Sequence, residues 1–146
     1  MQALGLVAAL LLFAGAPQQV RSPHDLSVGD PVRRSLLDAL RPEIERDLGQ
    51  KVRFVVETLR VQDNWAFAVV APRTPGGAKI DFARTHHAER QRAGVLDGDT
   101  IYALLERRSG RWSVRSFAIG PTDVAWADWS DEFGAPEALL GLPEQR

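Results

Sequence analysis

Residues 100–120 constrain the fold more than any other part of the chain. They read TIYALLERRSGRWSVRSFAIG, two apolar runs separated by Ser109-Gly110. Glycine accepts the positive φ that a two-residue hairpin turn requires, so these runs are predicted to pair as antiparallel strands. Centring the turn on this dipeptide sets Leu105 opposite Val114. The segment is therefore predicted to be a β-hairpin.

Both faces of this hairpin are apolar in the predicted register. One face carries five such residues: Ile101, Ala103, Leu105, Val114 and Trp112. The other sets Tyr102 opposite Phe117 and Leu104 opposite Arg115. Since neither face suits water, we expect other elements to cover both. This requirement predicts an α+β fold with a curved antiparallel sheet of about four strands in two hairpins.

A second hairpin is predicted upstream. Residues 51–62 alternate between apolar and polar positions, but the alternation changes phase, which a bulge near Glu57 would explain. Asp63-Asn64 is a turn pair, and residues 65–71 return as a second strand. The small alanines of that strand would let a helix lie close to the sheet.

The helix that covers one face is predicted to begin after Asp30. An acidic N-cap is followed by Pro31 in the first turn, and Gly49 stands where a left-handed cap is favoured. An apolar residue recurs every four positions: Val32, Leu36, Leu40, Ile44 and Leu48. Pro42 removes a backbone donor, so we expect a kink or a split near Arg41.

The N-terminal region is predicted to be a targeting segment. Residues 3–16 are apolar and uncharged, about the length of a signal-peptide core, which favours a periplasmic or secreted location over an N-terminal core helix or an uncleaved anchor. Residues 17–29 have the composition of a linker. The expected organisation is a signal-like segment at 1–16, this linker, and one α+β domain at 30–146, with no stable transmembrane span.

Two segments remain. Residues 78–98 are polar, with Ile80 and Phe82 suggesting a short strand or edge inside an excursion between the hairpins.

Three aromatic residues at helical spacing predict a short C-terminal helix on the other face of the sheet: Trp126, Trp129 and Phe133. A break at 134–136 and a last helical turn at 137–140 follow.

Composition excludes several kinds of chemistry. The net charge is −1 and the pI about 6.3, which argues against a nucleic-acid surface. The chain has no cysteine, so disulfides, thiolate nucleophiles and iron–sulfur clusters are excluded. No serine stands in G-x-S-x-G, and no phosphate-binding glycine motif is present. We therefore expect no cofactor.

Two groups of residues could carry chemistry. His86 and His87, with Glu89 nearby, could be metal ligands or a base with its orienting carboxylate, but a metal site needs further converging ligands. Without them the sequence predicts no metal, and solvated histidines are the plainer interpretation. The second group is acidic and surrounds the C-terminal tryptophans: Asp123, Asp128, Asp131 and Glu132. A carboxylate pair beside aromatic rings could do glycosidase-like acid and base work, and the alternative interpretation is the solvated face of a helix.

The predicted order of elements resembles a known plan. Helix, hairpin, excursion, hairpin and terminal aromatic helix are similar to the cystatin-like or NTF2-like α+β plan, in which a curved antiparallel sheet wraps a long N-terminal helix. The runs ALRPEIERDLGQKVRFVV, WAFAVVAP and ALLERRSGRWSVRSFAIGPTDVAWADW also resemble small uncharacterised secreted proteins of bacteria. Enzymes, inhibitors and ligand carriers share this plan, so the resemblance implies a fold and no activity.

The leading functional prediction is an exported, non-catalytic domain that binds a small ligand or an envelope protein. Incomplete cover of the sheet would place the ligand near Tyr102, Arg115, Phe117 and Trp126. The alternative is a small hydrolase or isomerase that uses Asp123, His86 or His87 in a pocket between helix and sheet. A third possibility is an accessory or inhibitor protein that acts on an envelope enzyme.

Overall fold

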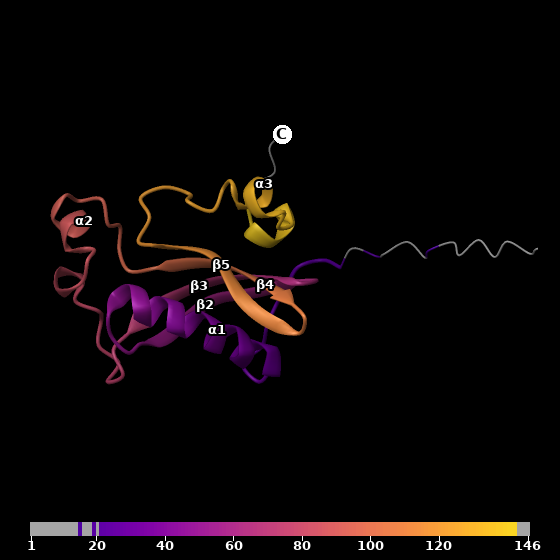
Figure 1. Ribbon diagram of the computed structural model, residues 1–146, viewed down its shortest axis with the longest axis horizontal. Helices are drawn as coiled ribbons and strands as arrows, with labels where there is room; N and C mark the ends of the chain where they lie inside the picture. Colours follow the sequence, from indigo (N-terminus) through magenta and orange to yellow (C-terminus); the bar gives the residue numbers. More distant parts are fainter. Residues whose placement is uncertain (1–14, 16–18, 20, 143–146) are drawn as a thin grey trace, which may run out of the picture.

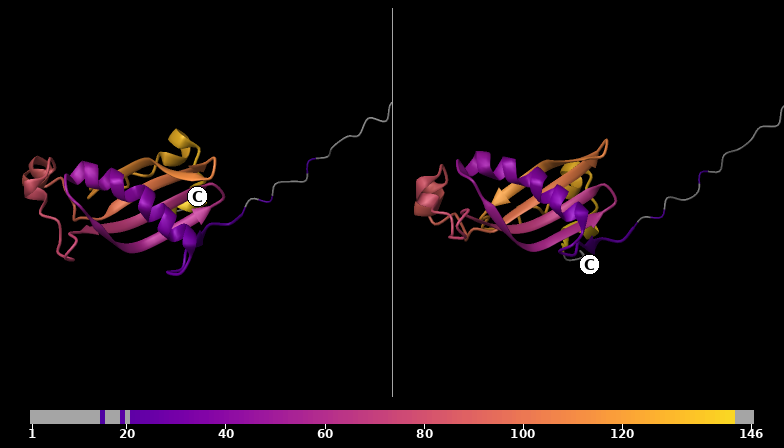
Figure 2. Two further views of the ribbon diagram at one scale, coloured as in Figure 1. Left: turned by 60° about the horizontal axis from the view of Figure 1, so that its bottom comes forward. Right: turned by 90° about the horizontal axis from the view of Figure 1, so that it is seen from below.

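The computed structural model describes residues 15, 19 and 21–142 of the 146-residue chain. Five strands form one antiparallel sheet in the order β1-β2-β3-β4-β5: β1 (His24–Asp25), β2 (Arg53–Gln62), β3 (Trp65–Arg73), β4 (Ile101–Arg108) and β5 (Arg111–Ile119). Helix α1 (Pro31–Leu48) lies across one face, and the C-terminal segment lies against the other (Figures 1 and 2). The predicted α+β class is confirmed.

Helix α1 begins and ends where its caps were predicted. The Asp30 side chain accepts a hydrogen bond from the backbone N–H of Val32 at 2.8 Å, and Gly49 takes the left-handed conformation. The helix continues through Pro42 without a break, so the expected split does not occur. Four residues on its inner face are buried against the sheet: Leu36, Leu40, Ile44 and Leu48.

The β2–β3 hairpin contains the predicted bulge. Its register shifts between Val56 and Thr58, which leaves Glu57 as the extra residue. Ala66 and Ala68 of β3 have no exposed surface and belong to the same core cluster as the α1 leucines. Small side chains at these positions allow α1 to lie close to the centre of the sheet.

The β4–β5 hairpin turns at the predicted dipeptide. Ser109 and Gly110 both have positive φ, 50° and 74°, as a two-residue hairpin turn demands. Leu105 pairs with Val114 as expected. The register is therefore confirmed for the half of the hairpin next to the turn.

Beyond Leu105 the predicted register is wrong by one residue. Leu104 pairs with Ser116 instead of Arg115, because Arg115 is the extra residue of a second bulge. Its insertion changes which face of the sheet each later residue of β5 occupies.

This shift separates two residues that were expected to be neighbours. Tyr102 pairs with Ala118, whereas Phe117 pairs with Ala103. Phe117 therefore packs in the layer beneath α1, while Tyr102 packs against the C-terminal segment on the opposite face. The sheet lies between the two rings.

The segment predicted to be a linker contributes a fifth strand. His24 pairs with Val61 and Asp25 with Arg60, and Leu26 is buried in the main core. The sheet therefore has five strands where about four were expected. The predicted signal segment lies outside the described residues except for residue 15. Within the described part of the chain, no helix is long and apolar enough to cross a membrane.

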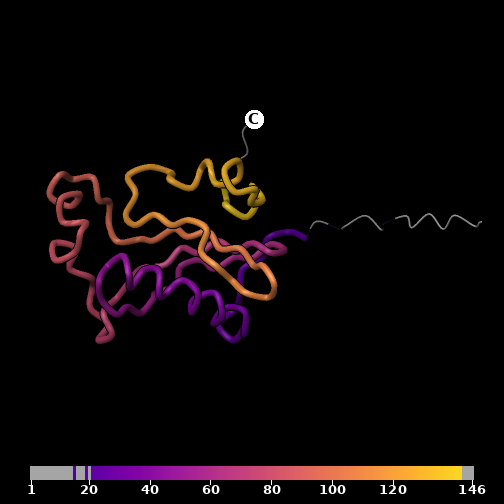
Figure 3. Tube along the Cα trace, viewed as in Figure 1, coloured from indigo at the N-terminus to yellow at the C-terminus, as the bar shows by residue number. Residues whose placement is uncertain are grey.

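The polar excursion after β3 has structure of its own. It contains a 3₁₀ turn, η1 (Phe82–Arg84), and a short helix, α2 (Ala88–Arg92). Ile80 and Phe82 are buried in the main core, so they anchor its first part. The strand expected there is reduced to one bridge between Arg73 and Lys79. The tube in Figure 3 shows how far the excursion extends beyond the sheet before it returns to β4.

The C-terminal helix is shorter than predicted. Helix α3 (Trp129–Phe133) excludes Trp126, which lies in the preceding turns, and a 3₁₀ turn, η2 (Glu137–Leu140), follows the predicted break. The segment forms a second, smaller core on its face of the sheet, with these buried members: Phe67, Val69, Leu104, Trp129, Ala135, Leu139 and Leu140.

Candidate functional site

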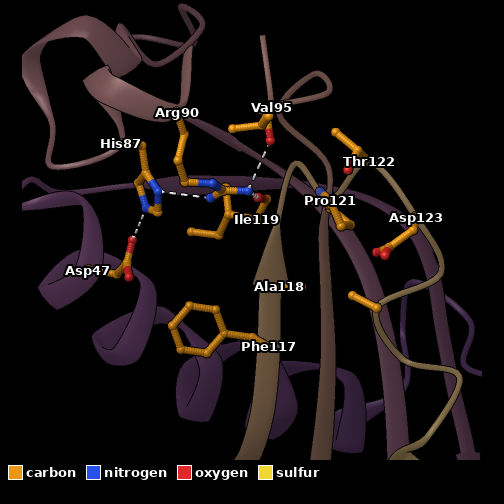
Figure 4. Close-up of a pocket in the computed structure, with 11 residues that line it drawn as sticks. Asp47, His87, Arg90, Val95, Phe117, Ala118, Ile119, Pro121, Thr122 and Asp123 are labelled. Carbon is orange, nitrogen blue, oxygen red and sulfur yellow. Dashed lines mark hydrogen bonds and ion pairs between the residues drawn. The ribbon is translucent and has the colours of Figure 1, made fainter. Parts of the chain in front are cut away.

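A surface pocket of about 500 Å³ lies at the end of β5, one of the two edge strands of the sheet. Its walls come from the last turn of α1, the excursion around α2, and the loop that follows β5 (Figure 4). We call it the Arg90 pocket. Its lining residues are Asp47, His87, Arg90, Val95, Phe117, Ala118, Ile119, Pro121, Thr122, Asp123 and Ala125.

His87 is the most buried polar residue of the pocket, with 6% of its surface exposed. Its Nε2 lies 2.6 Å from Oδ1 of Asp47, and its Nδ1 lies 3.1 Å from Nη1 of Arg90. A guanidinium group can only donate, so Nδ1 must accept and the ring proton must be on Nε2. The hydrogen bonds therefore assign a neutral ring that donates to Asp47.

Arg90 extends from α2 across the pocket to the backbone of β5. Its Nη2 donates to the carbonyl of Ile119 at 3.1 Å, with a longer contact of 3.5 Å to the carbonyl of Val95. Together with His87, these acceptors are all uncharged. Among the described residues, no carboxylate forms an ion pair with Arg90. Acceptors within the described part of the chain engage three of the five guanidinium N–H groups and leave two for other acceptors.

His86 lies beside His87 but outside the pocket. Its side chain is 62% exposed, and its Nε2 is 3.2 Å from the same Oδ1 of Asp47. The two imidazole rings are tilted by 36° with centroids 4.0 Å apart. Glu89, which the sequence suggested as the carboxylate partner, pairs with Arg92 instead.

The true partner, Asp47, comes from the end of α1, 40 residues away. Nothing in the local sequence around the histidines points to it. One available signal was its position in the last turn of a helix whose C-cap was predictable. That position places its side chain at the end of the helix, where the returning excursion passes.

Besides His87, Asp123 is the only catalytic candidate from the sequence that lines the pocket in the part of the chain that the structure describes. Its exposed side chain lies on the loop after β5, across the pocket from α2 (Figure 4). The other acidic residues of its predicted group do not line it: Asp128 occupies the N-cap position of α3, and Asp131 and Glu132 lie in the first turn of that helix. The structure therefore does not assemble these carboxylates into one site.

The four residues predicted to bind a ligand do not form one site either. Tyr102 stacks on Trp126, and Arg115 lies over the ring of Phe133, all on the C-terminal face of the sheet. Phe117 alone of the four lines the Arg90 pocket. The β5 bulge causes this division, because it turns Phe117 toward the α1 layer.

Comparisons of the chain with protein families, with curated proteins and with solved structures found no match. The resemblance to the cystatin-like or NTF2-like plan stays a prediction. The functional proposals below therefore rest on the residues and the geometry of the pocket.

Proposed function

We propose that this protein is a non-catalytic binding domain that holds a small anionic ligand in the Arg90 pocket. The observation that carries the proposal is the guanidinium group of Arg90, which has only uncharged acceptors among the described residues and retains two donors. Arginine forms its strongest hydrogen bonds with carboxylates and phosphates. An anionic ligand would supply the charged partner that Arg90 does not find among the described residues.

The other walls suggest the rest of the ligand. Phe117, Ile119 and Val95 offer apolar surface beside Arg90, and a pocket of about 500 Å³ falls in the size range of small-molecule sites. Asp123 would repel a second acidic group and accept a hydrogen bond from a donor. These features favour a small organic acid with a donor group at its far end, such as an amino acid.

Binding fits the geometry of His87 better than catalysis does. Both ring nitrogens are engaged, one by Asp47 and one by Arg90, so neither is available to accept a proton from a substrate. The alternative, a small hydrolase or isomerase, is supported by one observation: His87 and Asp123 line the same pocket. It requires Arg90 to leave Nδ1, after which His87 could act as a base oriented by Asp47.

Thermal unfolding with a panel of small acids tests the proposal. The panel holds amino acids, monocarboxylates, dicarboxylates and phosphate monoesters, with neutral sugars as the contrast. A ligand at one hundred times its Kd would stabilise the protein by about 2.7 kcal/mol, a Tm increase on the order of 5–10 °C. We expect an anionic compound to produce this shift.

Two arginine variants supply the comparison. Arg90→Met should abolish the shift, whereas Arg92→Met on the same short helix should retain it, because the Arg92 side chain is exposed and pairs with Glu89. Equal shifts in both variants, or no shift with any anion, would overturn the proposal. Turnover of a panel compound that is lost in Asp123→Asn would favour the enzyme instead.

The predicted export belongs to the same proposal. A periplasmic or secreted binding domain would meet its ligand, or an envelope protein partner, outside the cytoplasm. Fractionation of cells that express the full chain with a C-terminal tag tests this directly. Recovery of the tag in the cytoplasmic fraction alone would remove export from the proposal.

A further inference from the structure

Three potential metal ligands converge beside the Arg90 pocket. Asp47, His86 and His87 each offer one ligand atom, and these atoms all lie within 4.8 Å of one another. They come from the end of α1 and from the turn before α2. The sequence predicted no metal because no further ligand accompanied the two histidines, and Asp47 supplies one.

We propose that Asp47, His86 and His87 bind a divalent transition-metal ion, with zinc the ion that best fits two imidazoles and one carboxylate. Three protein ligands leave a fourth position for water or another group. His86 is 62% exposed, so an ion can enter from solvent. This site does not depend on the anionic ligand proposed above.

One of the donor-atom spacings already matches that of a bound ion, and a second needs a small movement. Two ligand atoms at about 2.05 Å from a tetrahedral ion lie roughly 3.3 Å apart. The Nε2 of His86 is 3.2 Å from Oδ1 of Asp47, which needs no adjustment. The Nε2 of His87 is 2.6 Å from the same oxygen and would have to move away from it by roughly 0.7 Å, the difference between the two spacings.

The position of the exposed imidazole also favours a ligand role. His87 alone is sufficient to tie the excursion to α1 through Asp47. Holding the exposed His86 ring against the same oxygen restricts its rotamers, and a surface contact of this kind contributes little in return. A metal ion shared by all three side chains gives this second ring a function.

Metal binding would change the hydrogen bond between His87 and Arg90. The ion needs the lone pair of Nε2, so the ring gives up its Nε2 proton and takes one on Nδ1, remaining neutral. The new N–H would then face the Nη1 donor of Arg90, now 3.1 Å away. Arg90 must therefore turn aside, and its hydrogen bond competes with the metal.

Zinc titration of the chelator-treated full chain by calorimetry tests the site, with Co²⁺ absorption as a second measurement. We expect one ion per chain and tetrahedral Co²⁺ bands. His86→Ala and Asp47→Asn should each lower zinc affinity at least tenfold. His24→Ala is the matched control, because the third histidine is exposed on β1 at the opposite edge of the sheet, and it should bind as the native chain does.

Arg90→Met separates this proposal from the anion proposal. It should raise zinc affinity by severalfold, since the competing donor is gone, while it removes the anion-dependent Tm shift. The metal site is overturned if the native chain binds no stoichiometric zinc or if His86→Ala binds as tightly as His24→Ala. Unchanged or weaker zinc binding in Arg90→Met would overturn the competition with Arg90.

Discussion

The phenol ring of Tyr102 lies against the indole of Trp126, with ring centroids 3.9 Å apart and planes inclined by 16°. The ring of Phe67, on the neighbouring strand β3, has its centroid 6.5 Å from that of Tyr102 and 6.1 Å from that of Trp126. Trp126 belongs to the loop that leaves β5, so this stack fastens that loop to the C-terminal face of the sheet. The same loop supplies Asp123 to the Arg90 pocket.

Removing this stack should destabilise the fold measurably. We expect Trp126→Ala to lower the free energy of unfolding by about 2–3 kcal/mol, below the range for a fully buried tryptophan because Trp126 is half-buried. Urea unfolding measures the loss. A double-mutant cycle with Tyr102→Ala should give a coupling of about 1 kcal/mol.

The cycle has an internal control. Trp112 packs in the α1 layer on the other face of the sheet, so Trp112→Ala combined with Tyr102→Ala should be additive. If the Trp126 and Tyr102 substitutions were also additive, the contact between the two rings would make no contribution of its own to the free energy of unfolding.

The N-cap of α1 should matter more than the helix surface. Asp30→Ala removes the acceptor for the Val32 N–H, and we expect a loss of about 1 kcal/mol in urea unfolding. Asp38→Ala is the matched control: Asp38 is exposed on the same helix and, within residues 21–142, pairs only with Arg41, so a loss of about 0.5 kcal/mol or less is expected. Equal losses in the two variants would contradict a capping role.

The carboxylate of Glu45 should make stability depend on pH. The backbone N–H of Val52 donates to it at 3.2 Å and, with help from Lys51, holds its pKa below the ordinary value of 4.5. Because the folded-state pKa is the lower one, the stabilisation is complete above pH 4.5 and is lost as the pH falls through the folded-state pKa.

Melting curves from pH 7 to pH 3 test this. The native chain should have a higher Tm than Glu45→Gln at pH 7, and the difference should shrink below pH 4.5. Glu43→Gln serves as the control, because Glu43 lies on the same helix and accepts its hydrogen bond from the exposed Arg46 side chain. A Tm difference that stays constant across the whole range would contradict the role of Glu45.

Two glycines with positive φ should differ sharply in their tolerance of alanine. Gly110 sits in the open β4–β5 turn, so Gly110→Ala should cost about 1 kcal/mol from backbone strain alone. At Gly120, with φ of 53°, an added Cβ would meet the carbonyl oxygen of Gly98 and Cδ1 of Leu96, each at 2.7 Å. We expect Gly120→Ala to cost about 3 kcal/mol or more in urea unfolding. Equal losses of unfolding free energy in the two variants would contradict this expectation and would mean that the backbone at Gly98 moves aside with little strain.

Local signals in the sequence were sufficient for most of the fold. The caps at Asp30 and Gly49, the bulge at Glu57 and the turn at Ser109 follow from residue preferences that act over a few positions. The alternation of side chains between the two faces of β3 also placed its alanines on the face that packs against α1. Such features depend on the backbone and on nearest neighbours, which the sequence displays directly.

The missed features depend on contacts between distant segments. His24 and Asp25 form a strand only because β2 has a free edge there, and a two-residue strand has no alternation to detect. Likewise, Asp47 meets His87 only because the excursion folds back over the end of α1. The Arg90 pocket was therefore half predicted: His87, Phe117 and Asp123 were named from the sequence, but Asp47 and Arg90 were not.

The bulge at Arg115 has a consequence for comparing sequences. Upstream of it, Trp112 and Val114 face α1 at even positions, and downstream Phe117 and Ile119 face α1 at odd positions. In a homologue that lacks the extra residue, the residues that face α1 must occupy every second position along the whole strand, without a change of phase. An alignment with such a homologue should place a one-residue gap at Arg115. A gap in the hairpin turn would instead align residues that face α1 with residues that face the C-terminal segment along half of β5.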